Sequence, residues 1–228
     1  MELFLIYNYR LNQFKIKNTQ TIMIYLKTFE RFNKVAFHGW KMEPQDMKLP
    51  ECEIEWEPGK KKGCPNFSDE SKITKEDEKL ATEYLNQKDV DTLIAYSRGG
   101  AILIQSVAKG AALPDNLYMV APAWLRGWST INLKGDEIKG AKGFIIHGGQ
   151  DDKVPLKHSV ILSKMSGLPL YVFPDRNHIS ILKHKDNTSG GIEVKNLDEL
   201  LKVLPDWGQG KSTQEQVDKQ YKISKQYI

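Results

Sequence analysis

Short apolar segments that alternate with helical patterns restrict the fold of this chain more than any other feature of its sequence. Several of them are apolar along almost their whole length, which is typical of strands covered on both faces. The six candidate strands span residues 34–39, 52–57, 91–96, 117–122, 143–148 and 168–174. Strands that alternate with helices predict an α/β fold, with a mostly parallel, doubly wound sheet and helices on both faces.

The segments between the candidate strands contain residues that typically begin and end helices. The stretch that begins at Gly99 is apolar nearly all round, so we expect that helix to be buried. The four expected helices begin near Thr74, Gly99, Leu156 and Asn196, and the last three end at Gly110, Gly167 and Pro205. Glycine after the last turn and proline beyond it are ordinary helix stops.

The pattern divides the chain into three parts. Residues 34–207 hold the expected α/β core, without an internal repeat or a linker that would split it. Residues 1–33 form either a β-hairpin at the sheet edge or a loose extension, and Met23 is an alternative natural start. Residues 208–228 form either a loosely held polar tail or a helix with one weak apolar stripe. The stripe would consist of Val217, Tyr221 and Ile228.

Composition and charge exclude several classes of protein. The chain has 228 residues, of which 40% are hydrophobic and 27% are charged, as in globular proteins. No apolar run is long enough to cross a bilayer, so we expect no stable membrane insertion. The N-terminal "MELFLIY" lacks the basic leader and the cleavage site of a secretory signal. The net charge is +4 and the lysines are scattered, so we expect no nucleic-acid binding.

The sequence contains two cysteines, Cys52 and Cys64. They lack C-x-x-C spacing and have no histidine partners nearby, so the pattern does not indicate a metal site. We therefore predict free thiols in a reducing compartment, and a cytoplasmic location.

A serine lies between a buried strand and a glycine pair in "LIAYSRGGA", residues 93–101. A sharp strand-to-helix turn would lift the hydroxyl of Ser97 above the sheet and point helix N–H groups at a developing negative charge. Such a turn needs small neighbours, and here they are Ala95, Gly99 and Gly100. The segment therefore predicts a nucleophilic serine, which also needs a base, an orienting acid and oxyanion donors.

Five segments together resemble the α/β-hydrolase family over residues 34–205. They are "KVAFHGW", "WEPGKKKG", "AYSRGG", "FIIHGGQDDKVP" and "VFPDRNHI", in that order along the chain. The second resembles the Pro-Gly turn that follows the next strand of that family, and the third has Ala95 where the commoner motif has glycine. The resemblance implies Ser97 as nucleophile, Asp151 as acid and His178 as base, in the family's chain order.

Other aspartates and histidines fit the roles of acid and base less well than Asp151 and His178. Asp152 is the nearest rival to Asp151, and Asp175 is more naturally a turn cap. Four other histidines fit the role of base less well: His38 and His147 follow strands in H-G turns and are expected to hold loop backbone, His158 falls on a helix, and His184 falls in a lysine-rich stretch.

Backbone N–H groups are expected to hold the oxyanion, and the resemblance points to those of Trp40 and Arg98. The tryptophans Trp40, Trp124 and Trp128 either line an acyl or alcohol pocket or cover the core. Arg98 and Arg126 either favour an anionic substrate group or are solvated or paired.

The connection between residues 122 and 143 is too short for a cap domain of several helices. We therefore predict a lidless core with an open site. The expected activity is that of a serine esterase or thioesterase acting on a small-molecule acyl substrate, without metal or organic cofactor. Two alternatives stay open, an acyltransferase with the same triad and a non-catalytic binding module of the same fold.

Overall fold

The computed structural model describes residues 34–53, 63–86, 90, 92–125, 127–207 and 212–228. The hairpin or extension expected for residues 1–33 lies outside the described residues, as do Arg126 and most of the strand expected at 52–57. All the described residues belong to one unit, Lys34–Ile228.

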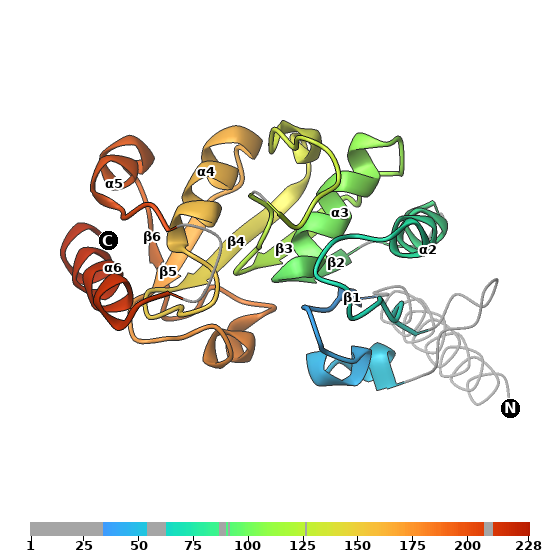
Figure 1. Cartoon of the computed structure of the whole chain (residues 1–228), viewed down its shortest axis with the longest axis horizontal. Helices are drawn as coiled ribbons and strands as arrows, with labels where there is room; N and C mark the ends of the chain where they lie inside the picture. Colours follow the sequence, from blue (N-terminus) through green and yellow to red (C-terminus); the bar gives the residue numbers. More distant parts are fainter. Residues whose placement is uncertain (1–33, 54–62, 87–89, 91, 126, 208–211) are drawn as a thin grey trace, which may run out of the picture. The chain divides into compact units, whose positions relative to one another are not determined.

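A sheet of six strands forms the centre of this unit (Figure 1). Its strands are β1 (Lys34–Phe37), β2 (Thr92–Tyr96), β3 (Asn116–Val120), β4 (Lys142–Gly148), β5 (Leu170–Phe173) and β6 (Ile192–Glu193). The strands lie in chain order across the sheet, and all neighbours are parallel except β5 and β6. All five residues of β2 are buried, which explains their uniformly apolar sequence. The α/β fold with a mostly parallel sheet is confirmed.

The helices between the parallel strands lie on one face of the described sheet. Because β1 to β5 follow one another in space, right-handed connections place the intervening helices on the same face of the sheet. Figure 1 shows these helices, α2 (Lys75–Leu85), α3 (Arg98–Ala108) and α4 (Leu156–Ser166), in a row along one side of the strands. Within the described part the strand order does not reverse, and most of the expected strand at 52–57 lies outside it, so the doubly wound arrangement stays a prediction.

Three short 3₁₀-helices contact β1 and β4. These are η1 (Pro44–Met47), η2 (Pro50–Glu53) and η4 (Ser180–His184), which Figure 1 shows below the sheet. Because β2, β4 and β5 are parallel, their carboxyl ends lie at one edge of the sheet, where α/β proteins of this kind bind their ligands.

Local signals in the sequence account for the helix boundaries. The Thr74 hydroxyl accepts the N–H of Asp77, whose carboxylate accepts the N–H of Thr74 in return, so α2 begins with a capping box. Gly167 ends α4 with a φ of 82°, a left-handed conformation that glycine adopts readily. The Asn196 side chain caps α5 (Leu197–Val203) as expected.

The C-terminal segment forms an ordered helix, α6 (Gln214–Tyr227), with Thr213 as its cap. Its buried residues are Gln220, Ile223 and Ser224 rather than the predicted apolar stripe. The helix therefore docks through a mixed polar and apolar face, and the alternative of a loosely held tail is wrong for residues 212–228.

Cys52 and Cys64 form a disulfide, so the prediction of free thiols is wrong. Cys52 lies in η2, where a strand was expected, and Cys64 lies beside β1, with its Sγ accepting the N–H of Ala36. Disulfides are rare in reducing compartments, and the pairing removes the argument from free thiols for a cytoplasmic location.

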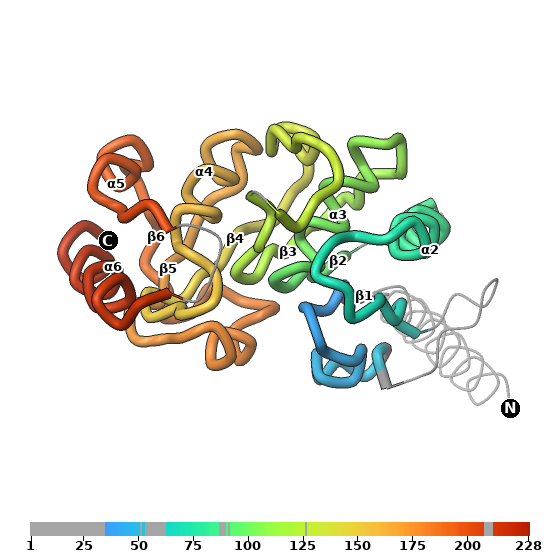
Figure 2. The backbone as a smooth tube through the Cα atoms, in the orientation of Figure 1, coloured from blue at the N-terminus to red at the C-terminus, as the bar shows by residue number. Residues whose placement is uncertain are grey.

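The connection from β3 to β4 carries one short 3₁₀-helix, η3 (Asp136–Ile138), among its described residues. Figure 2 follows this connection, and no bundle of helices interrupts it. Among the described residues of this connection, η3 is the one helical segment.

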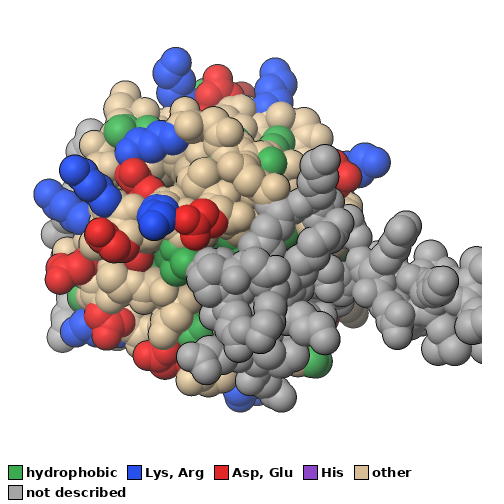
Figure 3. Space-filling view, turned by 90° about the vertical axis from the view of Figure 1, so that its right-hand side faces the viewer, with side chains coloured by type: hydrophobic (Ala, Val, Ile, Leu, Met, Phe, Trp, Pro, Cys, Tyr) green, Lys and Arg blue, Asp and Glu red, His purple; other side chains and the backbone are tan. Residues whose placement is uncertain are grey.

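Two surface properties bear on partners. Among the described helices, none combines the length and the apolar character that a membrane span requires. Among the described side chains on the face shown in Figure 3, lysine and arginine are interspersed with aspartate and glutamate.

Candidate active site

Ser97 occupies the turn between β2 and α3 in a backbone conformation that non-glycine residues rarely adopt, with φ 51° and ψ −120°. This turn can form because the residues that follow Ser97 closely, Gly99 and Gly100, have no side chain. A Cβ added to Gly99 would lie 2.2 Å from the carbonyl oxygen of Phe37, and one added to Gly100 would lie 2.9 Å from Pro122 Cβ. The glycine pair therefore lets α3 start against the end of β1 and against the segment after β3, which presents Ser97 at the sheet edge.

Ser97, His178 and Asp151 form a continuous chain of hydrogen bonds, as the sequence predicted. His178 Nε2 lies 3.1 Å from Ser97 Oγ, and His178 Nδ1 lies 2.7 Å from Asp151 Oδ2. With Nδ1 protonated and donating to the carboxylate, Nε2 is free to accept the serine proton. The three residues come from the ends of β2, β5 and β4.

The loop after β4 holds the carboxylate of Asp151 as an anion. Its second oxygen, Oδ1, accepts the backbone N–H groups of Lys153 and Val154 at 2.9 and 2.8 Å. Burial alone would raise the pKa of Asp151. The electrostatic attraction and hydrogen bond of His178, with contributions from His147 and the Val154 N–H, outweigh it, so the pKa lies below the usual value.

The rival carboxylates are engaged elsewhere. Asp152 pairs with Lys153 at 2.7 Å, and Asp175 pairs with Lys225 at 2.8 Å while it accepts the Tyr221 hydroxyl. Neither has a hydrogen bond to His178 among the described contacts.

Two histidines hold backbone, as predicted. His38 Nε2 accepts the N–H of Phe67, which leaves its Nδ1 to donate to the carbonyl oxygen of Gly39. The buried His147 bonds Ser159 Oγ and the Val154 carbonyl oxygen, and burial lowers its pKa. Both rings therefore brace the loops that flank the site.

The two expected oxyanion donors lie at the same edge as Ser97. Arg98 is the first residue of α3, and Trp40 follows the end of β1, which pairs directly with β2. Neither backbone N–H is used in a hydrogen bond with another described residue. Both groups stay available for an oxyanion.

The side chain of Arg98 has a structural role. It is fully buried, and its Nη2 donates to Asp77 Oδ2 at 2.6 Å and to the Lys72 carbonyl oxygen at 3.0 Å. Of the alternatives for Arg98, the structure selects pairing over contact with an anionic substrate. Arg126 lies outside the described residues.

Of the three tryptophans, Trp124 covers the core and Trp128 lines a cavity. Trp124 is 2% exposed and donates its Nε1–H to the His158 carbonyl oxygen. Trp128 lines a cavity of about 920 Å³, and its ring packs edge-on against that of Trp40 with centroids 5.8 Å apart.

Two supporting residues were missed by the sequence analysis. The Tyr96 hydroxyl donates to the carbonyl oxygen of His178 at 3.0 Å, and its ring lies against the imidazole. Gln220 of α6 bonds the backbone of the loop that carries Asp151. Tyr96 precedes the nucleophile, which was a usable signal, whereas nothing near Gln220 in the sequence indicates its partner.

Ser97 and His178 are each only 6% exposed. The structure describes one short 3₁₀-helix between β3 and β4, and the open site stays a prediction. Substrate access depends on the loops and side chains around the sheet edge.

The described fold and site define an α/β protein with a serine, a histidine and an aspartate hydrogen-bonded in series at the carboxyl edge of its parallel sheet. No protein-family model, curated protein or solved structure matches the chain. Inferences about its activity therefore depend on the geometry of the site itself.

Proposed function

We propose that this chain is a serine hydrolase of the α/β-hydrolase type, which cleaves a carboxylic ester or thioester through an acyl-enzyme. The observation that carries the proposal is the series of hydrogen bonds from Ser97 Oγ through His178 to Asp151. The strained turn at Ser97 is a second support, because such strain persists where a side chain must be presented.

Each residue has a defined task in the proposed reaction. His178 Nε2 takes the Ser97 proton as Oγ attacks the acyl carbonyl carbon, and Asp151 stabilises the imidazolium that forms. The backbone N–H groups of Arg98 and Trp40 stabilise the oxyanion. His178 then protonates the leaving alcohol or thiol. Water next attacks the acyl-enzyme, His178 takes its proton, and collapse of the second intermediate releases the acid and restores Ser97.

The test combines active-site labelling with hydrolysis of p-nitrophenyl butyrate. We expect a fluorophosphonate to modify Ser97, as located by peptide mass spectrometry. Ser97→Ala should abolish labelling and lower kcat/KM by at least about 10³-fold, because the nucleophile is lost. Ser189→Ala, at an exposed serine, is the matched control and should leave both unchanged.

The alternatives give different results in the same experiment. An acyltransferase would label at Ser97 but transfer the butyryl group to added alcohols or amines in preference to water. A non-catalytic binding module would fold normally by circular dichroism, yet neither label nor turn over. Hydrolysis that survives Ser97→Ala unchanged would refute the proposal.

A further inference from the structure

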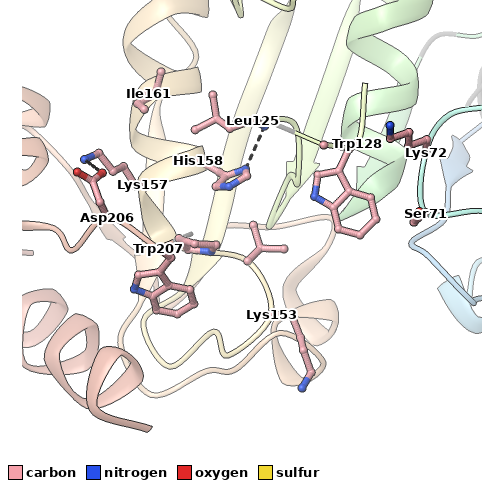
Figure 4. Close-up of a pocket in the computed structure, with 13 residues that line it drawn as sticks. Ser71, Lys72, Leu125, Trp128, Lys153, Lys157, His158, Ile161, Asp206 and Trp207 are labelled. Atoms are coloured by element: carbon pink, nitrogen blue, oxygen red, sulfur yellow. Dashed lines mark hydrogen bonds and ion pairs between the residues drawn. The ribbon is translucent and has the colours of Figure 1, made fainter. Parts of the chain in front are cut away.

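A cavity of about 920 Å³ lies between the segment after β3 and the N-terminal half of α4. Figure 4 shows Trp128 and Trp207 on two sides of it, with Leu125 and Ile161 along one wall. Large aromatic and branched side chains around a cavity of this size favour a ligand with an apolar body.

The walls of this cavity contact the candidate catalytic residues at two points. The Trp128 ring packs on Trp40, whose backbone N–H is an expected oxyanion donor. Val154 lines the cavity, and its own N–H donates to Asp151 Oδ1 at 2.8 Å. The cavity wall therefore contacts both the residue expected to hold the oxyanion and the loop that carries Asp151.

His158 offers a neutral hydrogen-bond donor to the cavity. Its Nδ1 accepts the backbone N–H groups of Trp124 and Leu125, both at 3.2 Å, which assigns the proton to Nε2. Burial, with a contribution from His147, lowers the pKa of His158 to about 3, so the ring is neutral at physiological pH. Within the described part of the chain, Nε2 has no hydrogen-bond partner.

Positive charge exceeds negative charge around the same cavity. Lys72, Lys153 and Lys157 line it, against the single carboxylate of Asp206. Lys157 pairs with Asp206, and Lys153 pairs with Asp152. Lys72 has no ion pair with any other described residue.

We propose that this cavity binds a part of the substrate that joins an aromatic or branched apolar body to an anionic group. The apolar body contacts Trp128 and Trp207, the Nε2–H of His158 donates to an oxygen of the ligand, and the lysines attract its negative charge. The assignment of this ligand as a substrate rests on the proposed function, whereas the binding itself does not.

The first experiment measures binding without turnover. Calorimetric titration of the Ser97→Ala protein with 4-phenylbutyrate and with the neutral 4-phenylbutyramide isolates the effect of the charge. We expect the acid to bind at least tenfold more tightly, with the preference falling as salt is added. 3-Phenylpropyl phosphate tells whether carboxylate or phosphate is preferred. Equal binding of acid and amide would overturn the proposal.

The second experiment locates the ligand by substitution in the same background. Lys72→Met with Lys153→Met should reduce the preference for the acid at least fivefold. His158→Asn keeps an acceptor for the two backbone N–H groups, but its shorter side chain lacks the Nε2–H, so it should weaken binding of both ligands severalfold. The matched control is Lys164→Met. Lys164 lies on α4 with His158 but does not line the cavity, and its substitution breaks a surface ion pair with Asp198. Unchanged binding in the lysine and histidine variants, with native circular dichroism, would exclude this cavity.

The two proposals fail separately. Acid binding without fluorophosphonate labelling would leave an anion-binding cavity without hydrolysis. Labelling of Ser97 without acid binding would leave the hydrolase and remove the assignment of this cavity. If both hold, 4-phenylbutyrate should inhibit hydrolysis of p-nitrophenyl butyrate competitively in the wild-type protein.

Discussion

The side-chain amide of Gln220, eight residues from the C-terminus, bonds the loop that carries Asp151. Its Nε2 donates to the carbonyl oxygens of Gly149 at 3.2 Å and Asp151 at 3.4 Å, and its Oε1 accepts the N–H of Leu156 at 2.8 Å. One buried side chain of α6 therefore fastens both ends of the loop that positions the acid.

Gln220→Met should destabilise the protein and reduce hydrolysis together. The substitution keeps the volume but leaves three buried backbone groups without a partner, at a cost of about 1–3 kcal/mol in the free energy of unfolding. Loss of the loop position should lower kcat more than it raises KM, because Asp151 acts in the transition state. Urea unfolding and steady-state kinetics measure the two effects.

Gln226→Met is the control for this prediction, since Gln226 is exposed on the same helix. It should change the free energy of unfolding by less than about 0.5 kcal/mol. If Gln220→Met altered stability but left kcat intact, the role of Gln220 in positioning Asp151 would be wrong.

The buried ion pair of Arg98 and Asp77 predicts a large effect of removing one partner. Asp77→Asn would leave the Arg98 guanidinium without its anion at complete burial, which costs about 3–5 kcal/mol. The exposed pair of Lys79 and Glu83 supplies a comparison on the same helix, and Glu83→Gln should cost less than about 1 kcal/mol. Chemical denaturation of both variants tests the contrast. Similar losses for the two pairs would contradict it.

The sequence predicted those parts of the site that depend on local signals. Ser97, Asp151 and His178 each follow a short apolar strand, and parallel strands bring their carboxyl ends to one edge. The contacts of Gln220 and Arg98 depend instead on how α6, α2 and α3 dock, and no spacing along the chain encodes that docking.

For the fold, too, the sequence predicted the local elements but not how they pack together. Apolar runs located β1 to β5, whereas the short strand β6 was missed. The placement of α2, α3 and α4 on one face follows from strand order, which periodicity does not specify. The disulfide between Cys52 and Cys64 was missed because its formation depends on the chain path between them.

Gly99→Ala should be far more damaging than Gly100→Ala. The added Cβ at residue 99 would meet backbone, the carbonyl oxygen of Phe37, at 2.2 Å, whereas at residue 100 its nearest neighbour is Pro122 Cβ at 2.9 Å. We expect a loss of at least about 3 kcal/mol for Gly99→Ala and about 1–2 kcal/mol for Gly100→Ala. Thermal and urea unfolding give the order. Comparable stability of the two variants would show that α3 can move away from β1.

The lowered pKa of His158 predicts a loss of stability in mild acid. The group titrates near 6.5 when unfolded and near 3 when folded, so the unfolded state binds more protons between these values. The stability is complete above about pH 6.5 and falls as the pH decreases, by up to about 1.4 kcal/mol per pH unit for this histidine. His158→Asn should flatten the dependence between pH 6.5 and 4.5. An unchanged slope in urea unfolding would mean that the ring is protonated in the folded state.

The disulfide of Cys52 and Cys64 predicts that reduction destabilises the region beside β1. Closing a short loop between residues 12 apart restricts the unfolded chain, and this constraint contributes about 2–3 kcal/mol. The double substitution Cys52→Ser, Cys64→Ser should lower the free energy of unfolding by that amount, and dithiothreitol should have the same effect on the wild-type protein and none on the variant. Because Cys64 Sγ accepts the N–H of Ala36 in the strand that leads to Trp40, the loss should also slow fluorophosphonate labelling of Ser97. Two free thiols by mass spectrometry in the non-reduced protein would contradict the pairing itself.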